Sequence, residues 1–280
     1  MYYSMIAISA LLFSMQFMFN DGFVKENGNG LSTALKFSFY TSIVGVILLF
    51  FINSFHFEVS WFSIAIAMVY SLVCIVLSYC SVKAFSYANL AVYSVFSMIG
   101  GMILPFIYGA VMGEEITFMR VLCCLLICLA VIITVQDGKT NKKAFKFYIG
   151  VFVLNGMVGV ISSFHQSKET LCTDSSSFLA LTKIITLLIC SVLILIKRNS
   201  FKISKKSLLL SVGNAGFNSI GNLMLLIALL HIPASVQYPI VTGGTIVFAC
   251  IIDKMRKVKV TNKELIAAIL ALVASVFMAF

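Results

Sequence analysis

Residues 176–196 read SSFLALTKIITLLICSVLILI, an apolar run with a single charge at Lys183. A helix of about 20 apolar residues is what crosses the ~30 Å hydrocarbon core of a bilayer. In lipid every backbone N–H and C=O must be paired within the protein, so only helices and closed barrels span it. Barrel strands would be short and alternating, which this run is not. The run therefore predicts a transmembrane helix.

The same pattern recurs along the 280-residue chain. Hydrophobic residues make up 61% and charged residues 11%, whereas soluble domains are nearer half apolar and a quarter charged. The predicted fold class is an all-α integral membrane protein of ten transmembrane helices. The ten runs are 2–19, 31–52, 60–82, 89–112, 118–136, 147–165, 176–196, 207–229, 233–252 and 262–280.

Basic residues gather in alternate loops. The poorer set holds Arg120 and Lys168. The positive-inside rule places the richer set in the cytoplasm and both termini outside. The net charge of +10 is thus a topology signal, and we expect contact with anionic lipid headgroups and no nucleic-acid partner. The richer set holds Lys25, Lys83, Lys139, Lys142, Lys143, Lys146, Lys197, Arg198, Lys202, Lys205, Lys206, Lys254, Arg256, Lys257, Lys259 and Lys263.

Two segments indicate an internal repeat. Residues 91–101 (AVYSVFSMIGG) and 234–244 (ASVQYPIVTGG) share an alanine and a Gly-Gly pair in register, and Lys36 in the second run matches Lys183 in the seventh. The halves are then 1–140 and 141–280, each with five spans. Because five is odd, the second half would be inverted, which is a common transporter architecture with its solute site near the midplane. Chance similarity of apolar runs is the alternative.

The stretch 84–135 carries a family resemblance. Its motifs are Ala84-Phe85-Ser86-Tyr87, a Gly/Ser-bearing fourth helix and Gly113-Glu114-Glu115-Ile116-Thr117. It resembles the EamA-type branch of the drug/metabolite transporter (DMT) superfamily. The resemblance implies five plus five spans, a central cavity and alternating access. It also implies cytoplasmic termini, opposite to what the lysines indicate, so the direction of transport stays open.

Charges inside a span are costly and mark candidate sites. Lys36 and Lys183 lie well inside their runs, each about two turns from its start. Pseudo-symmetry would aim both at one cavity, where they would bind an anionic group of the solute, such as a carboxylate or phosphate. The alternative is that a lysine two turns deep extends its ammonium group to the interface. We expect loss of either lysine to reduce uptake of an anionic solute.

The eighth run adds Asn214, Asn218 and Asn222, which recur every four residues and form one stripe. Carboxamides donate and accept hydrogen bonds, which suits a polar solute, although interhelical bonding is the alternative. Further substrate-binding candidates are Gln16, Tyr93, Gln237 and Tyr238, with Asn20, Tyr79, Ser97, Asn155 and His165 as weaker ones.

Acidic residues fall at run ends or in loops, among them Asp21, Glu58, Asp174 and Asp253, which argues against efflux of cations. Cysteines lie mostly in apolar runs, so we expect no metal and no cofactor. The sequence thus predicts a secondary transporter for a small polar solute, with an anionic one favoured, acting as a monomer or homodimer in a plasma membrane, with a bacterial one favoured.

Two alternatives to a transporter stay open. One is a non-transporting membrane scaffold or receptor, which would have no central polar cavity. The other is an intramembrane enzyme, because Glu114, Glu115 and Arg120 nearly resemble the glutamate pair and arginine of membrane-embedded prenyl-type proteases. The spacing is one residue too long and the partner histidine motifs are missing, so we expect no enzymatic activity.

Overall fold

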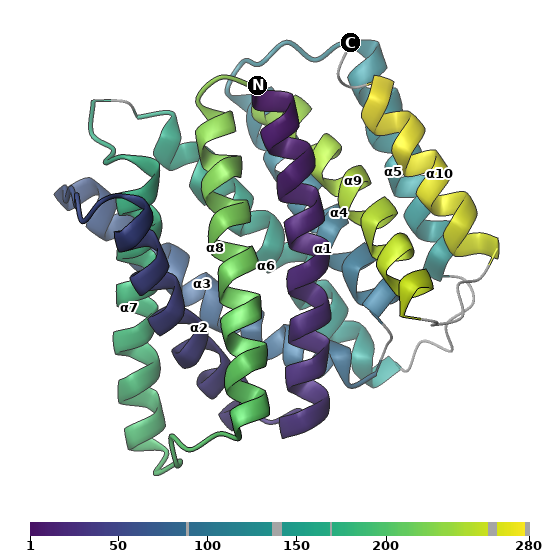
Figure 1. Cartoon of the computed structure of the whole chain (residues 1–280). Helices are drawn as coiled ribbons and strands as arrows, with labels where there is room; N and C mark the ends of the chain where they lie inside the picture. Colours follow the sequence, from purple (N-terminus) through teal and green to yellow (C-terminus); the bar gives the residue numbers. More distant parts are fainter. Residues whose placement is uncertain (88–89, 136–141, 169, 257–261, 278–280) are drawn as a thin grey trace.

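The computed structural model describes residues 1–87, 90–135, 142–168, 170–256 and 262–277, which form α-helices and no strands. Successive helices run in alternating directions, and the first turn of α1 and the last turn of α10 lie at the same end of the bundle (Figure 1). The helices are α1 (Tyr2–Asn27), α2 (Leu31–Ile52), α3 (Trp61–Phe85), α4 (Leu90–Val111), α5 (Phe118–Val135), α6 (Lys142–Gln166), α7 (Ser175–Ile196), α8 (Lys205–Leu229), α9 (Ala234–Met255) and α10 (Asn262–Phe277).

The helices coincide with the predicted apolar runs, and most ends agree within three residues. The first run is the main exception, because α1 continues for eight residues beyond Phe19 to Asn27. Within the described residues, seven helices are long and apolar enough to cross a membrane, namely α1, α2, α3, α6, α7, α8 and α9. These seven indicate a multi-pass membrane protein. That all ten helices cross the bilayer stays a prediction.

Several helices begin at a side-chain cap, which satisfies backbone N–H groups that have no partner in the first turn. The hydroxyl of Ser60 accepts a hydrogen bond from Ser63 N at 3.0 Å, and that of Ser204 accepts one from Ser207 N at 3.0 Å. Asp174 caps α7 in the same way. Helix α2 differs, since it begins after Gly30 with no side-chain cap.

The contacts between helices follow a regular pattern. Helix α1 packs on α8 as α6 packs on α3, and α1 packs on α9 as α6 packs on α4. Likewise α2 packs on α8 as α7 packs on α3. Helices α2 and α7, α4 and α9, and α5 and α10 pack on each other directly, and α5 and α10 lie together at one side of the bundle (Figure 1). A shift of five helices thus exchanges the two members of each of the first three comparisons, and it maps each of the last three pairs onto itself.

The two Gly-Gly pairs lie where helices approach closely. A Cβ at Gly100 would overlap the main chain of Phe152, so α4 and α6 meet backbone to backbone there. A Cβ at Gly244 would lie 2.9 Å from the Cβ of Ala10, which brings α9 against α1. In the repeat alignment Gly101 matches Gly244, and a Cβ at Gly101 would lie 2.7 Å from Asn155 Nδ2 of α6. Each Gly-Gly pair therefore permits a close helix contact, as small residues do between membrane helices.

One end of the bundle, called here the lysine-rich end, carries the C-terminal ends of α1, α7 and α9 (Figure 1). Ion pairs join its helices: Lys206 of α8 lies 2.7 Å from Glu26 of α1, and Arg256 beyond α9 lies 3.8 Å from Asp21 of α1. Lys139, Lys257 and Lys259, and the predicted boundary between residues 140 and 141, lie outside the described residues.

Candidate functional site

A cavity of about 230 Å³ lies in the middle of the bundle. Helices α1 to α4 and α6 to α9 all contribute lining residues, whereas α5 and α10 contribute none of the described ones. The volume is just below the range of roughly 300–1,000 Å³ that is typical of small-molecule sites. Its position and size suit a small solute.

The lining is rich in hydrogen-bonding groups. It combines amides from α1, α6 and α8 with serine and threonine hydroxyls from most of the other helices, and three tyrosines, Tyr70, Tyr93 and Tyr238, add aromatic surface. Among the described lining residues Lys183 is the one charged side chain, and there is no carboxylate. The cavity therefore carries an excess of one positive charge when Lys183 is protonated.

Lys183 is the ninth residue of α7 and extends toward α8. Its Nζ donates a hydrogen bond to Asn218 Oδ1 at 3.0 Å. Its aliphatic stem passes Gly45 of α2, where a Cβ would lie 3.3 Å from both Cγ and Cδ of the lysine. The glycine thus leaves room for the stem, and the amide orients the ammonium group.

The predicted asparagine stripe of α8 faces the cavity and α1 together. Asn218 Nδ2 donates to Gln16 Oε1 at 2.5 Å, and Asn214 Nδ2 donates to Gln16 O at 2.9 Å. Asn222 Nδ2 donates to Asn218 O at 2.8 Å within α8. All four residues line the cavity. The asparagine stripe therefore lines the cavity and also forms hydrogen bonds between α1 and α8. Cavity lining and interhelical bonding, the two roles considered from the sequence, both occur.

The two predicted tyrosines also line the cavity, but protein groups already bond their hydroxyls. Tyr93 Oη lies 2.8 Å from Ser81 Oγ, and Tyr238 Oη donates to Gly159 O at 3.1 Å. Both rings therefore offer the solute mainly their faces and edges. The weaker candidates Asn20, Ser97 and Asn155 line the cavity as well.

Lys36 does not lie where the pseudo-symmetry predicts. It is not among the cavity lining, and its Nζ donates to Lys202 O at 3.1 Å at the lysine-rich end. Lys36 is the sixth residue of α2, whereas Lys183 is the ninth of α7. Three residues shift a side chain by about 4.5 Å along a helix and by roughly 60° around it. Lys36 therefore extends toward the lysine-rich end of the bundle and not into the cavity, which agrees with the alternative interpretation of this lysine.

Gln237 also lies outside the cavity lining. Its side chain is fully buried, and Nε2 donates to Leu225 O at 2.8 Å, which joins α9 to α8. Gln237, in the first turn of α9, therefore contributes to the packing of α9 on α8.

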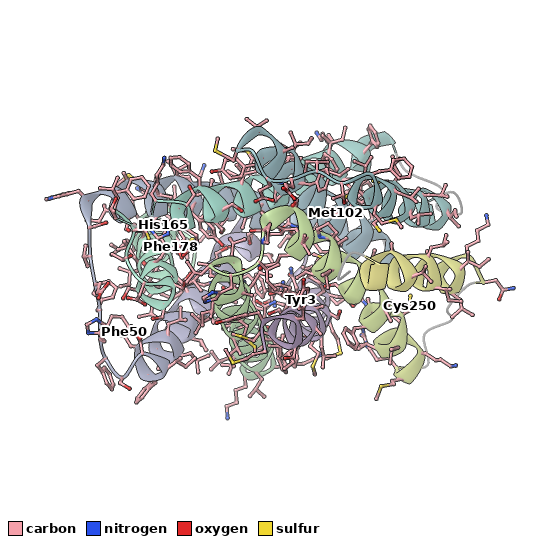
Figure 2. All side chains as sticks on the ribbon, turned by 90° about the horizontal axis from the view of Figure 1, so that it is seen from above. Tyr3, Phe50, Met102, His165, Phe178 and Cys250 are labelled. Carbon is pink, nitrogen blue, oxygen red and sulfur yellow. The ribbon has the colours of Figure 1, made fainter. Side chains whose placement is uncertain are left out.

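His165 and Tyr79, two weaker candidates, are used elsewhere. His165 Nε2 lies 2.8 Å from Ser63 Oγ, and the imidazole stacks on Phe178 with ring centroids 3.8 Å apart. Figure 2 shows His165 and Phe178 together in this view along the bundle. Tyr79 packs edge-on against Phe147. Neither His165 nor Tyr79 is among the lining residues.

Sequence reasoning missed two further features. Ser219 Oγ lines the cavity and is buried without a hydrogen-bond partner, but a serine in an apolar helix gives no distinctive signal. Asp21 lies in the last two turns of α1, is 3% exposed and pairs through its carboxylate with Lys25 at 2.7 Å, which its position near a run end does not reveal. The predicted run ended at Phe19 because the polar residues that follow it lower the hydropathy, although α1 continues to Asn27.

Glu114, considered as part of an enzyme site, makes contacts of a structural kind. Its two carboxylate oxygens accept hydrogen bonds from Ala234 N at 3.1 Å and Ser235 N at 2.9 Å, at the start of α9. A carboxylate is favourable there because a helix N-terminus carries partial positive charge. No group of three His, Cys, Asp or Glu side chains that could hold a metal occurs among the described residues.

Comparison with known proteins supports the fold only. No family model and no curated protein matches the chain. Solved structures do match, and one described only as "Crystal structure of protein" superimposes with a TM-score of 0.74 over 98% of this chain and 95% of its own length. The two sequences are 14% identical, so the likeness concerns the arrangement of helices and carries no function.

Proposed function

We propose that this protein is a secondary transporter that carries a small polar solute with an anionic group across the membrane. The observation that carries the proposal is the cavity in the middle of the bundle. Among the described residues, all seven helices long and apolar enough to cross a membrane contribute to its lining, and Lys183 is its one charged lining residue. A polar cavity at that depth is costly to form and provides a binding place for a solute that lipid excludes.

The proposal includes ten spans arranged as two inverted halves, which rock about the cavity to expose it to each side in turn. It is supported by the helix contacts that a five-helix shift relates, and by the equal contribution of four helices from each half to the lining. The resemblance of residues 84–135 to EamA-type transporters stays part of the proposal.

An anionic group on the solute follows from the charge of the cavity. An ammonium group removed from bulk water needs hydrogen bonds and a counter-charge, and Asn218 supplies a neutral acceptor only. A carboxylate or phosphate would complete the pairing with a charge-assisted hydrogen bond. The surrounding amides and hydroxyls would then bind the polar remainder of the solute.

The test begins with a screen of purified protein for metabolites that raise its melting temperature, since a ligand that binds only the folded state stabilises it. Each stabilising metabolite is then offered to proteoliposomes. We expect saturable uptake of at least one anionic metabolite. Stabilisation without any uptake would favour a receptor and contradict the transporter proposal.

A pair of bulky substitutions on α3 links uptake to the cavity. Ser78 lines it, whereas Val76, two residues away on the same helix, is 49% exposed on the outer surface. Ser78→Trp should abolish uptake because the indole fills the path, and Val76→Trp should leave uptake near the wild-type rate. A Ser78→Trp protein with an unchanged melting temperature and full uptake would show that the solute passes elsewhere.

A further inference from the structure

A group of basic residues at the lysine-rich end is not used by the proposed solute site. It comprises Lys36 of α2, and Lys197, Arg198, Lys202 and Lys205 in and beside the loop between α7 and α8, and is called here the basic patch. The four loop residues are exposed. Within the described part of the chain none of the five forms an ion pair, whereas neighbouring Lys206 pairs with Glu26.

Three contacts fold the loop onto one face of α2. Lys36 Nζ donates to Lys202 O at 3.1 Å, and Tyr40 Oη donates to Phe201 O at 2.8 Å. The rings of Phe39 and Phe201 pack with centroids 5.1 Å apart. Lys36 and Tyr40 are one helical turn apart, so they lie on the same face of α2. The patch is therefore a built surface, in which α2 and the loop are held together.

The surface next to the patch changes from apolar to basic within one helical turn. On α7, Leu188, Val192, Leu195 and Ile196 are more than half exposed, which is the character of a lipid-facing surface. Lys197 and Arg198 follow directly. Tyrosine is enriched at the depth where acyl chains give way to headgroups, and Tyr40 lies beside this boundary. The apolar residues of α7 would contact the acyl chains, Tyr40 the region between acyl chains and headgroups, and the basic residues the phosphate of the headgroup.

We propose that the basic patch binds the phosphate-bearing headgroup of an anionic phospholipid, whose acyl chains lie along the exposed face of α7. Lys36 has three N–H donors and the structure uses one of them on Lys202 O, so two are available to phosphate oxygens. Lys202 and Arg198 add charge at the same level. The inference is independent of the proposed transport activity, because none of these residues lines the cavity.

The test compares two lipids in vesicles of phosphatidylcholine that contain the purified protein. Trace spin-labelled phosphatidylglycerol or phosphatidylcholine reports, by its immobilised fraction, how strongly each lipid associates with the protein. We expect the wild type to favour phosphatidylglycerol several-fold. The variant Lys36→Gln/Lys197→Gln/Lys202→Gln should lower that preference to about one, and Lys36→Gln alone should lower it partly.

Lys168→Gln is the matched control, because it removes one exposed charge from the opposite end and should leave the preference unchanged. An undiminished preference in Lys36→Gln and in the triple variant would overturn the proposal, as would full displacement of the labelled lipid by inorganic phosphate at equal concentration, which would indicate a free-phosphate site. If the triple variant loses its melting transition, the comparison of Lys36→Gln with Lys168→Gln decides the outcome.

Discussion

Helices α2 and α7 are both 22 residues long, pack on each other, and each carries a single lysine. Their lysines nevertheless end in different surroundings. Lys183 lies in the central cavity and bonds Asn218, whereas Lys36 bonds a main-chain carbonyl at the lysine-rich end. Helix α7 begins at the carboxylate cap of Asp174, whereas α2 begins after Gly30 without a side-chain cap.

The difference shows how little separates a lysine that lines the cavity from one at the lysine-rich end of the bundle. Lys36 is the sixth residue of its helix and Lys183 is the ninth. This difference of three positions separates a lysine that bonds the loop at the lysine-rich end from one that lines the central cavity. The interior position also needs partners, and the chain supplies them around Lys183 through Asn218, Gln16 and Gly45. A lysine that recurs in two aligned apolar runs is therefore no evidence for a recurring role.

The largest expected effect comes from reversing the interior charge. Lys183→Glu should lower uptake of an anionic solute at least about 100-fold, because a charge-assisted hydrogen bond of roughly 1.5–3 kcal/mol is lost and like-charge repulsion is added. Lys36→Glu should stay within about twofold of the wild type. Both are measured in phosphatidylcholine proteoliposomes, where the basic patch has no anionic lipid. Equal losses in both variants would remove the distinction between the lysines.

The next effect comes from the amide that orients Lys183. Asn218→Leu removes the acceptor for the lysine and the donor to Gln16, so we expect about a tenfold lower apparent affinity for the solute, read from the concentration dependence of uptake. Asn53→Leu is the control, since Asn53 bonds His56 O in the loop after α2. A tenfold loss in both variants would point to a general effect on folding.

A smaller effect is expected where the lysine stem passes α2. In Gly45→Ala the new methyl group would lie 3.1 Å from Ser219 Oγ and 3.3 Å from the lysine stem, so the ammonium group must shift by a few tenths of an ångström. We expect two- to fivefold weaker binding by titration calorimetry. In Gly216→Ala the nearest atom would be 3.9 Å away, so binding should not change. Unaltered binding in Gly45→Ala would mean that the stem adapts freely.

The smallest effect concerns the caps that begin the two helices. Burial raises the pKa of Asp174, but hydrogen bonds from Ser176 and Ser177 outweigh it and hold the pKa below its ordinary value of 3.8. Asp174→Ala should cost about 1 kcal/mol of stability at neutral pH. Because the folded-state pKa is lowered, this contribution is complete above the unfolded-state pKa and is lost as the pH falls through the folded-state value.

The melting temperatures of wild type and Asp174→Ala should therefore differ at pH 7 and converge as the pH is lowered below about 3.8. Gly30→Ala in α2, which starts without a side-chain cap, should show no such pH dependence. A gap that persists unchanged to pH 3 would show that the carboxylate does not act as the cap.

Much of this architecture could be predicted from the sequence because lipid imposes a simple rule. Apolar runs of about 20 residues must be helical, and the run at 31–52 coincides with α2 at both ends. The asparagines of α8 could be predicted to share a face from their spacing alone. The end of α1 could not be predicted, because hydropathy falls in its last turns although the helix continues to Asn27.

The site was harder to predict than the helices. Side-chain depth and rotation depend on where each helix begins, and an uncertainty of three residues is enough to exchange an interior position for an interfacial one. Lys36 was included because the repeat pairs it with Lys183, although it lies three positions nearer the start of its helix. Gln237 was included for its polarity, and its side chain bonds Leu225 O outside the cavity. The room for Lys183 beside Gly45 arises from the contact of α2, α7 and α8, which the local sequence does not encode.

The central claim is that Lys183, and not Lys36, binds the anionic group of the solute. Titration calorimetry of one anionic solute against detergent-purified wild type, Lys183→Met and Lys36→Met tests it most directly. We predict about 10- to 100-fold weaker binding in Lys183→Met, as expected for the loss of one charge-assisted hydrogen bond, and binding within twofold of wild type in Lys36→Met. Wild-type affinity in Lys183→Met would contradict the account.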